Sequence, residues 1–161
     1  MFEFLWNHTL GQILMTLLVS MVPVIELRGA IPMAVSAGLP YYVAIPLAVI
    51  GNLIPVPFII FYIKRIFAWI RKKMPKLNRI VDKLEERGRS KSDAVQKSAF
   101  WGLFIFVAIP LPGTGAWTGA LIAAMLDMRL KKAFPAIVAG VLTAGAIVTV
   151  VTALGFDIFI K

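Results

Sequence analysis

Five long apolar runs without a charged residue restrict what this chain can fold into. Uncharged runs of 18 or more residues are typical of transmembrane helices, because a helix rising about 1.5 Å per residue must cross about 30 Å of hydrocarbon. Residues of the AVILMFWYC type make up 60% of the 161 residues and charged residues only 16%, so a water-soluble fold could not bury all five runs. We therefore expect an all-α integral membrane protein with a single membrane domain over residues 1–161. The runs are 10–25, 29–39, 41–63, 99–126 and 136–156.

Two segments have the length of one membrane crossing each. A helix over residues 41–63 would be about 34 Å long, and a helix over 134–156 would be similar. We expect both to be transmembrane helices that span the bilayer once.

The run 99–126 is interrupted in its middle, at residues 110–115 (PLPGTG). Prolines remove backbone donors and glycines permit sharp bends, so a helix is expected to stop here. The arms on either side have 11 residues each. Each arm would be about 16 Å long as a helix, which is half of a membrane crossing. This pattern predicts a re-entrant helical hairpin over 99–126.

Residues 10–39 have a similar pattern, with an interruption at 26–29 (ELRG) that is flanked by Pro23 and Pro32. We predict a second re-entrant hairpin over 10–39. Its first arm is longer, about 24 Å as a helix, so a tilted full crossing is the alternative.

Positive charge is concentrated in one connection of the chain. Residues 64–97 hold twelve basic and four acidic side chains, so nearly all of the net charge of +9 lies there. Basic loops of membrane proteins stay in the cytoplasm, which accounts for the charge without a nucleic-acid partner. We expect a basic amphipathic helical connector, split at Pro75, that lies on the anionic cytoplasmic leaflet of the phospholipid bilayer. If both interrupted segments are hairpins, Arg129 is cytoplasmic too, whereas two full crossings would place it outside, against this trend.

The two halves of the chain follow one plan. A hairpin followed by a spanning helix occurs twice, and a shift of 89 positions brings residues 46–51 (PLAVIG) onto 135–140 (PAIVAG). Because the second half enters from the opposite face, the pattern predicts two inverted repeats, a plan that recurs in secondary transporters.

Glu26 and Arg28 are the only acidic or basic residues within the predicted hairpins and spanning helices. An unpaired charge at membrane depth costs roughly 2.5–3.5 kcal/mol on insertion scales. One interpretation is therefore an ion pair or a position at the membrane interface. The other is a polar cavity, in which Arg28 beside Gly29 binds an anionic headgroup and Glu26 holds a proton or a cation.

The second interruption could complete such a cavity. The turn at residues 112–115 opens onto a predicted helix N-terminus, where free N–H groups and the positive dipole end favour an anion. In the middle of 41–63, Asn52 is either a contact between helices or a binding residue. The residues predicted to bind substrate are Glu26, Arg28, Gly29, Asn52, Pro112, Gly113, Thr114, Gly115 and Trp117, with Glu26 as the proton-coupling group.

Enzymatic chemistry finds no support in the sequence. The chain has no cysteine, a single histidine, His8, without an acidic neighbour at metal-ligand spacing, and no Gly-rich nucleotide loop. We expect no catalytic residue, no metal, no cofactor and no ATP-driven pumping.

At residues 23–32 (PVIELRGAIP) and 110–119 (PLPGTGAWTG), the sequence resembles the prokaryotic family of small multidrug export proteins. More distantly it is similar to the DedA and VTT superfamily. The resemblance implies a multi-pass protein of the prokaryotic inner membrane, with two inverted repeats that each combine a re-entrant segment and a helix. For some DedA relatives it also implies translocation of undecaprenyl phosphate with proton coupling.

Three functional classes stay open from the sequence. The first is a homodimeric transporter of an amphipathic anionic lipid such as undecaprenyl phosphate, with Arg28 at the headgroup and Glu26 coupling protons. The second is proton-coupled efflux of cationic small molecules at Glu26. The third is a structural membrane protein whose basic connector organises anionic lipid.

Overall fold

The computed structural model describes residues 8–73, 93–111, 113–126 and 128–159. Within these ranges every regular element is a helix, which agrees with the all-α fold predicted from the apolar runs. The helices are α2 (Thr9–Met21), α3 (Glu26–Ser36), α4 (Tyr41–Leu53), α5 (Pro55–Lys73), α7 (Asp93–Ala108), α8 (Ala116–Met125) and α9 (Leu130–Phe159).

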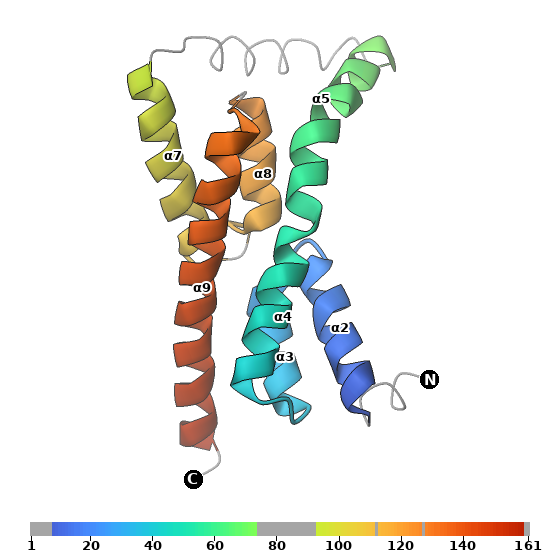
Figure 1. Ribbon diagram of the computed structural model, residues 1–161, viewed down its shortest axis with the longest axis vertical. Coiled ribbons are helices and arrows are strands. Elements are labelled where there is room, and N and C mark those ends of the chain that lie inside the picture. Colours follow the sequence, from blue (N-terminus) through green and yellow to red (C-terminus); the bar gives the residue numbers. More distant parts are fainter. Residues whose placement is uncertain (1–7, 74–92, 112, 127, 160–161) are drawn as a thin grey trace.

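Two short helical hairpins approach each other from opposite ends of the molecule (Figure 1). The first, α2 and α3, packs against α4, and the second, α7 and α8, packs against α9 and α5. Helix α9 extends along both hairpins, and α4 and α5 follow one another along the height of the molecule, each also in contact with α9. The loop between α2 and α3 and the loop between α7 and α8 both lie near half height. Residues far apart in the sequence therefore meet at the centre of the molecule.

Two stretches are long and apolar enough to cross a membrane, namely Tyr41–Ile63 in α4 and α5 and Leu130–Gly155 in α9. Both long helices continue beyond the predicted ends, because α5 extends to Lys73 and α9 begins at Leu130. A break separates α4 from α5 just before Pro55, and neither Pro55 nor Pro57 can donate a backbone hydrogen bond to the preceding turn.

The interruption of the first hairpin lies earlier than the sequence predicted. The prediction placed it at residues 26–29, whereas α2 ends at Met21 and α3 already begins at Glu26. The turn contains two non-glycine residues with positive φ, Val24 at 90° and Glu26 at 50°. Pro32, predicted to flank the break, lies inside α3. Such breakers are tolerated in helices whose freed backbone groups find other partners, so their presence did not locate the break.

The basic connector predicted over 64–97 is described only at its two ends. Its first residues continue α5 as far as Lys73, and its last residues begin α7 at Asp93. The middle of the connector, with the split predicted at Pro75, lies outside the described residues.

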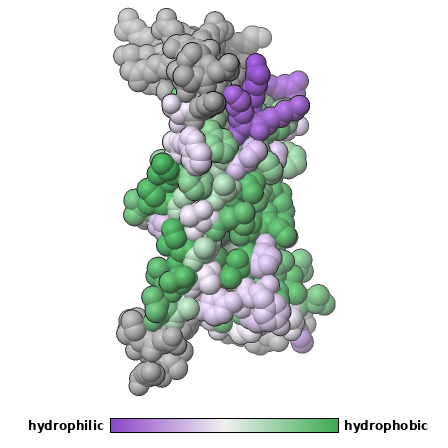
Figure 2. Space-filling view, turned by 60° about the vertical axis from the view of Figure 1, so that its left-hand side comes forward, coloured by the Kyte–Doolittle hydropathy of each residue, from purple (hydrophilic) through white to green (hydrophobic). Residues whose placement is uncertain are grey.

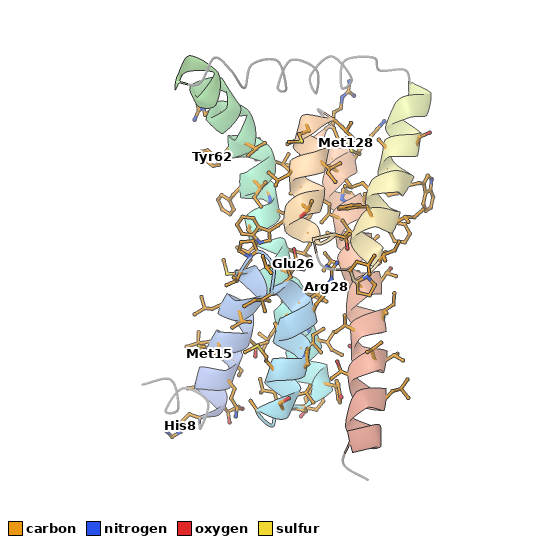
Figure 3. The ribbon with its side chains drawn as sticks, turned by 180° about the vertical axis from the view of Figure 1, so that it is seen from behind. His8, Met15, Glu26, Arg28, Tyr62 and Met128 are labelled. Carbon is orange, nitrogen blue, oxygen red and sulfur yellow. The ribbon has the colours of Figure 1, made fainter. Side chains whose placement is uncertain are left out.

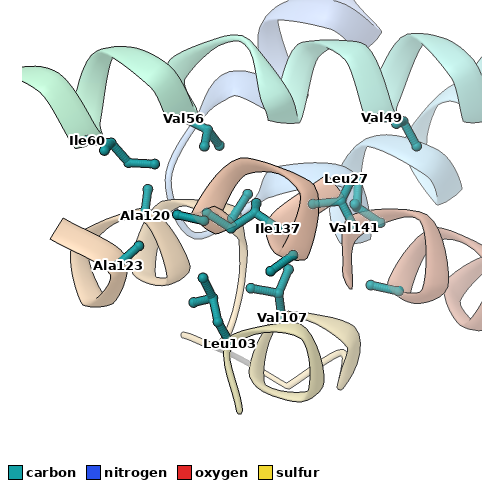
Figure 4. Close-up of a cluster of buried hydrophobic side chains, with 14 of the residues drawn as sticks. Leu27, Val49, Val56, Ile60, Leu103, Val107, Ala120, Ala123, Ile137 and Val141 are labelled. Atoms are coloured by element: carbon teal, nitrogen blue, oxygen red, sulfur yellow. The ribbon is translucent and has the colours of Figure 1, made fainter. Parts of the chain in front are cut away.

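Small side chains fill much of the centre of the bundle, between valines, leucines and isoleucines (Figure 4). On α9, Ala136, Gly140 and Ala144 form a stripe of small residues. A Cβ added to Gly140 would lie 2.7 Å from the Cβ of Val107, so α7 and α9 are in close contact along this stripe. Lipid tails are as apolar as leucine, so helices in a bilayer associate mainly through close packing. Small residues at the interface permit this close approach.

Large apolar side chains cover the outside of the bundle (Figure 2). Leu10, Leu14 and Leu18 form an exposed stripe along α2. Hydrophilic residues gather at one end of the molecule in Figure 2, the end where Arg129 and Lys131 lie exposed. Soluble proteins of this size rarely expose so much apolar surface, so the surface is suited to a lipid environment.

Candidate functional site

Glu26 begins α3 at the point where the two hairpin loops meet (Figure 3). Its side chain is only 4% exposed. Its Oε1 accepts a hydrogen bond from the backbone N–H of Trp117 at 3.3 Å. The carboxylate also lies directly on Gly115, because a Cβ added to that glycine would overlap the carboxylate atoms. The first hairpin thus places its single acid on the start of α8.

The start of α8 is a suitable place for a carboxylate. The N-cap of this helix is Gly115, which has no side chain to accept a hydrogen bond from the first N–H groups. A carboxylate oxygen accepts such bonds well, and the positive end of the helix dipole favours a negative charge. Glu26 therefore acts as the N-terminal cap of α8, supplied by the other hairpin.

Arg28 reaches the opposite arm of the second hairpin. One terminal nitrogen, Nη1, donates to the carbonyl oxygen of Leu111. The other, Nη2, donates to the carbonyl oxygen of Ile109 and to Oγ1 of Thr114, both at 3.2 Å. These acceptors follow the C-terminus of α7, the negative end of that helix dipole. Arg28 therefore caps α7 while Glu26 caps α8.

Thr114 holds the loop in the shape that Arg28 requires. Its hydroxyl lies 2.7 Å from the carbonyl oxygen of Ile109 and 2.9 Å from that of Leu111, and it accepts from the N–H of Leu111 at 3.2 Å. The same carbonyl groups are the ones that Arg28 binds. The loop thus presents a pre-formed set of acceptors to the guanidinium group.

The two charges serve different helix ends rather than each other. Among the described residues, the side-chain hydrogen bonds of Glu26 and Arg28 all go to the second hairpin. Both terminal nitrogens of Arg28 are occupied by protein acceptors, and only its buried Nε lacks a partner there. In this state of the protein, Arg28 has few donors left for an external anion, whereas the carboxyl group of Glu26 is held by one long hydrogen bond.

Trp117 fastens the second hairpin to the first. Its indole Nε1 donates to the carbonyl oxygen of Met21, the last residue of α2, at 3.0 Å. Its backbone N–H is the donor that Glu26 accepts. Trp117 therefore joins the two hairpin loops, and its predicted contact with a substrate stays a prediction.

The other predicted site residues are spread around this centre. Gly29 lies in the first turn of α3, where a Cβ would overlap the side chain of Ile25. Gly113 is exposed in the second loop with φ of +83°, and Pro112 lies outside the described residues. Asn52, near the end of α4, is 1% exposed, and both atoms of its amide lack a partner within the described part of the chain.

The sequence missed the backbone atoms that complete the site. The carbonyl groups of Met21, Ile109 and Leu111 all accept hydrogen bonds at the centre, but carbonyl oxygens have no signature in residue type. The only available signal was the PLPGTG interruption, because a broken helix leaves unpaired carbonyl groups. Within the described residues, no group of three or more His, Cys, Asp or Glu side chains could hold a metal ion.

Comparison with known families and proteins places the chain in a family. A family model described as "Putative small multi-drug export protein" matches residues 26–147, a range that contains Glu26, Arg28 and both hairpin loops. No curated protein and no solved structure matches the chain.

Proposed function

Because the chain belongs to the family of small multi-drug export proteins, we propose that it is a membrane exporter in which Glu26 exchanges a proton for a cationic small molecule. The observation that carries this proposal is the place of Glu26. It is the only acidic residue on α2, α3, α4, α5 and α8, it is 4% exposed, and it lies where hairpins from both ends of the molecule meet.

The geometry of the two hairpins supports the following arrangement in the membrane. Helices α2 and α3 enter from one face and α7 and α8 from the other as re-entrant hairpins, while α4–α5 and α9 span the bilayer. Each hairpin followed by a long helix is then one of two inverted repeats, and their interface lies near the midplane, as in other secondary transporters. The basic connector lies in the cytoplasm of a prokaryotic cell, whose inner membrane holds the protein. The homodimer stays a prediction.

A single carboxylate is sufficient for an electroneutral exchange. Protonated Glu26 releases its proton toward the cytoplasm and binds a monovalent cation there. After the centre opens to the outside, a proton replaces the cation, which leaves the cell. One positive charge moves in each direction, so the inward proton gradient drives export. While the cation is carried outward through the closed state, the hydrogen bond from Trp117 helps to hold the carboxylate.

Translocation of undecaprenyl phosphate is the second candidate from the sequence, and the geometry favours it less. An anionic headgroup would need the planar fork of Arg28. In the structure that fork binds Leu111, Ile109 and Thr114. A phosphate could bind only after the second loop released Arg28.

Transport by the purified protein in lipid vesicles tests the proposal. With the cytoplasmic face of the protein outward and an acidic lumen, wild-type vesicles should accumulate ethidium, a monovalent cationic dye. Glu26→Gln keeps the shape and the acceptor for Trp117 but cannot ionise, so uptake should fall to the level of protein-free vesicles. Thr16→Val is the matched control, because it removes a buried hydroxyl that, among the described residues, bonds to its own helix.

A second measurement separates the two substrate classes. If Glu26→Gln takes up ethidium as fast as the wild type, the exchange of a proton for a cation does not occur at Glu26. A different result would favour the lipid carrier function. In that case native mass spectrometry would show undecaprenyl phosphate bound to the wild type but not to Arg28→Gln, and the wild type would not transport ethidium. Loss of activity only when the charges of the connector are neutralised would favour the structural class.

A further inference from the structure

Asn52 combines complete burial with a lack of partners at both polar atoms. Its side chain is 1% exposed, and neither Oδ1 nor Nδ2 has a hydrogen-bond partner among the described residues. A buried amide that leaves water without finding a hydrogen-bond partner destabilises the folded protein. A group that both donates and accepts would remove this cost.

The packing of α3 against α4 places Asn52 at the level of Glu26. The two helices are consecutive and antiparallel. Because both rise by the same amount per residue, residues that lie opposite each other have numbers with a constant sum. Two pairs of buried alanines, each pair within one buried cluster, have residue numbers that add up to 78. One turn further along both helices, the numbers of Glu26 and Asn52 have the same sum. The alanine pairs are Ala34 with Ala44 and Ala30 with Ala48.

The packing of α5 against α8 gives the same level independently. These two helices run in the same direction (Figure 1), and Val56 of α5 and Ala120 of α8 belong to one buried cluster. One turn before Val56 lies Asn52, and one turn before Ala120 lies Ala116, the first residue of α8. Ile54, which lies between Asn52 and Val56, has helical dihedral angles, φ −54° and ψ −49°. Asn52 and Val56 therefore lie on the same face. Asn52 is therefore level with the start of α8, where the Glu26 carboxylate lies on Gly115.

A protonated carboxyl group is the complement of a primary amide. The acid has one O–H donor and one carbonyl acceptor, while the amide has the acceptor Oδ1 and the donor Nδ2. The two groups can form a closed pair with two hydrogen bonds. A carboxylate has no donor, so only the protonated acid can satisfy both atoms of the amide.

We infer that Asn52 is the hydrogen-bond partner of Glu26 in its protonated state, with the Glu26 hydroxyl donating to Oδ1 and Nδ2 donating to the Glu26 carbonyl oxygen. This inference rests on the proposed function, in which Glu26 gains and loses a proton. Charged Glu26 accepts the hydrogen bond from the Trp117 N–H that is present in the structure, and protonated Glu26 turns to α4. Asn52 is thus a positioning residue that gives the neutral acid a defined place at the centre.

Few other charged or titratable groups face this pair. Helices α2, α5 near the break and α8 hold none, and the tyrosines of α4 lie in its first turn, at the opposite end of the helix from Asn52. On α3 the other charge is Arg28, which is bound to the second loop. Helix α9 carries its charged residues only near its two ends, away from the centre.

Infrared spectroscopy of the purified protein in lipid tests the pairing directly. A protonated carboxyl group has a C=O stretching band, and the band that is lost in Glu26→Gln belongs to Glu26. In Asn52→Leu this band should shift to higher frequency, because the carbonyl loses a donor. Uptake of ethidium driven by the pH gradient should fall about tenfold, the effect of one lost hydrogen bond of ordinary strength. Thr16→Val should leave the band unchanged.

The outcomes distinguish the inference from the function beneath it. If no band is lost in Glu26→Gln at any pH, protonation of Glu26 and the proposed exchange both fail. A Glu26 band that is identical in wild type and Asn52→Leu overturns the pairing alone. Leucine is expected to fold, since an apolar group of similar size removes the unpaired atoms. If the Asn52→Leu protein does not fold, Asn52→Ala replaces it, and the Glu26 band should shift to higher frequency in that variant too.

Discussion

The backbone N–H of Trp117 donates to the carboxylate of Glu26 at 3.3 Å, although 91 residues separate them in the chain. With the bonds from Arg28 to the second loop, this contact makes each hairpin loop a structural support for the other. Neither hairpin spans the molecule alone. We therefore expect substitutions at the contact to affect stability and transport together, and substitutions elsewhere on the same helices to separate the two.

Gly115→Ala should damage the centre directly. Its Cβ would overlap the Glu26 carboxylate, so the carboxylate must leave the start of α8. We expect a loss of about 1–3 kcal/mol in the free energy of unfolding, typical of overpacking, and loss of ethidium uptake. Gly102→Ala is the control, since its Cβ meets nothing within 4 Å. That change should stabilise α7 by about 0.5–1 kcal/mol. Equal stability of the two variants would contradict the position of Glu26.

Arg28→Gln should lower stability because it removes the cap of α7. We expect a loss of at least about 1.5 kcal/mol, the usual value for hydrogen bonds to a charged group. Arg28→Lys should restore only part of it, because an ammonium group cannot form the planar fork. Thermal unfolding in detergent measures both. If Arg28→Gln unfolds at the wild-type temperature, Arg28 is not held by the loop and is free to bind an anion.

Trp117→Phe should separate the two roles of this residue. The variant loses the bond from the indole Nε1 to the carbonyl oxygen of Met21 but keeps the backbone N–H for Glu26. We expect a loss of about 1 kcal/mol in stability with transport retained at temperatures where the protein stays folded. Abolished transport in a folded Trp117→Phe protein would show that the indole acts on the substrate.

Two glycines of α9 form a matched pair for helix packing. A Cβ at Gly140 would lie 2.7 Å from the Cβ of Val107, whereas a Cβ at Gly145 meets only the Cγ2 of Val49 at 3.7 Å. Gly140→Ala should therefore destabilise the protein by about 1–3 kcal/mol. Gly145→Ala should be neutral or gain up to about 1 kcal/mol from helix propensity. Chemical unfolding of both variants under identical conditions is the measurement, and the reverse order would contradict the close contact of α7 and α9.

Membrane topology can be tested with single cysteines, because the chain contains none. Ser36 and Arg129 are both exposed. If the hairpins are re-entrant, Ser36→Cys should react with an impermeant thiol reagent only from the outside of the cell, and Arg129→Cys only from the cytoplasm. Labelling of Arg129→Cys from the outside would mean that the second hairpin crosses the membrane.

Much of the architecture could be predicted from residue order. The charge-free runs predicted helices, and the lengths of 41–63 and 134–156 predicted two stretches able to span a bilayer. The PLPGTG sequence predicted the break before α8, since proline and glycine stop a helix wherever no neighbour compensates. The break of the first hairpin was misplaced, because Gly29 and Pro32 are accommodated inside α3. Proline and glycine occur on both sides of this region, so residue type alone did not locate the break. The packing of the helices determined its position.

The sequence by itself determined that Glu26 and Arg28 needed partners, because two charges within apolar segments are too costly to leave unpaired. Which partners they found was decided only by the tertiary structure. The acid caps one arm of the second hairpin and the base caps the other, while the buried amide of Asn52 has no hydrogen-bond partner in the described part of the chain. The physical reason is that these partners are backbone groups freed at helix ends. Such groups carry no mark in the sequence and become available only when two loops from opposite ends of the fold meet.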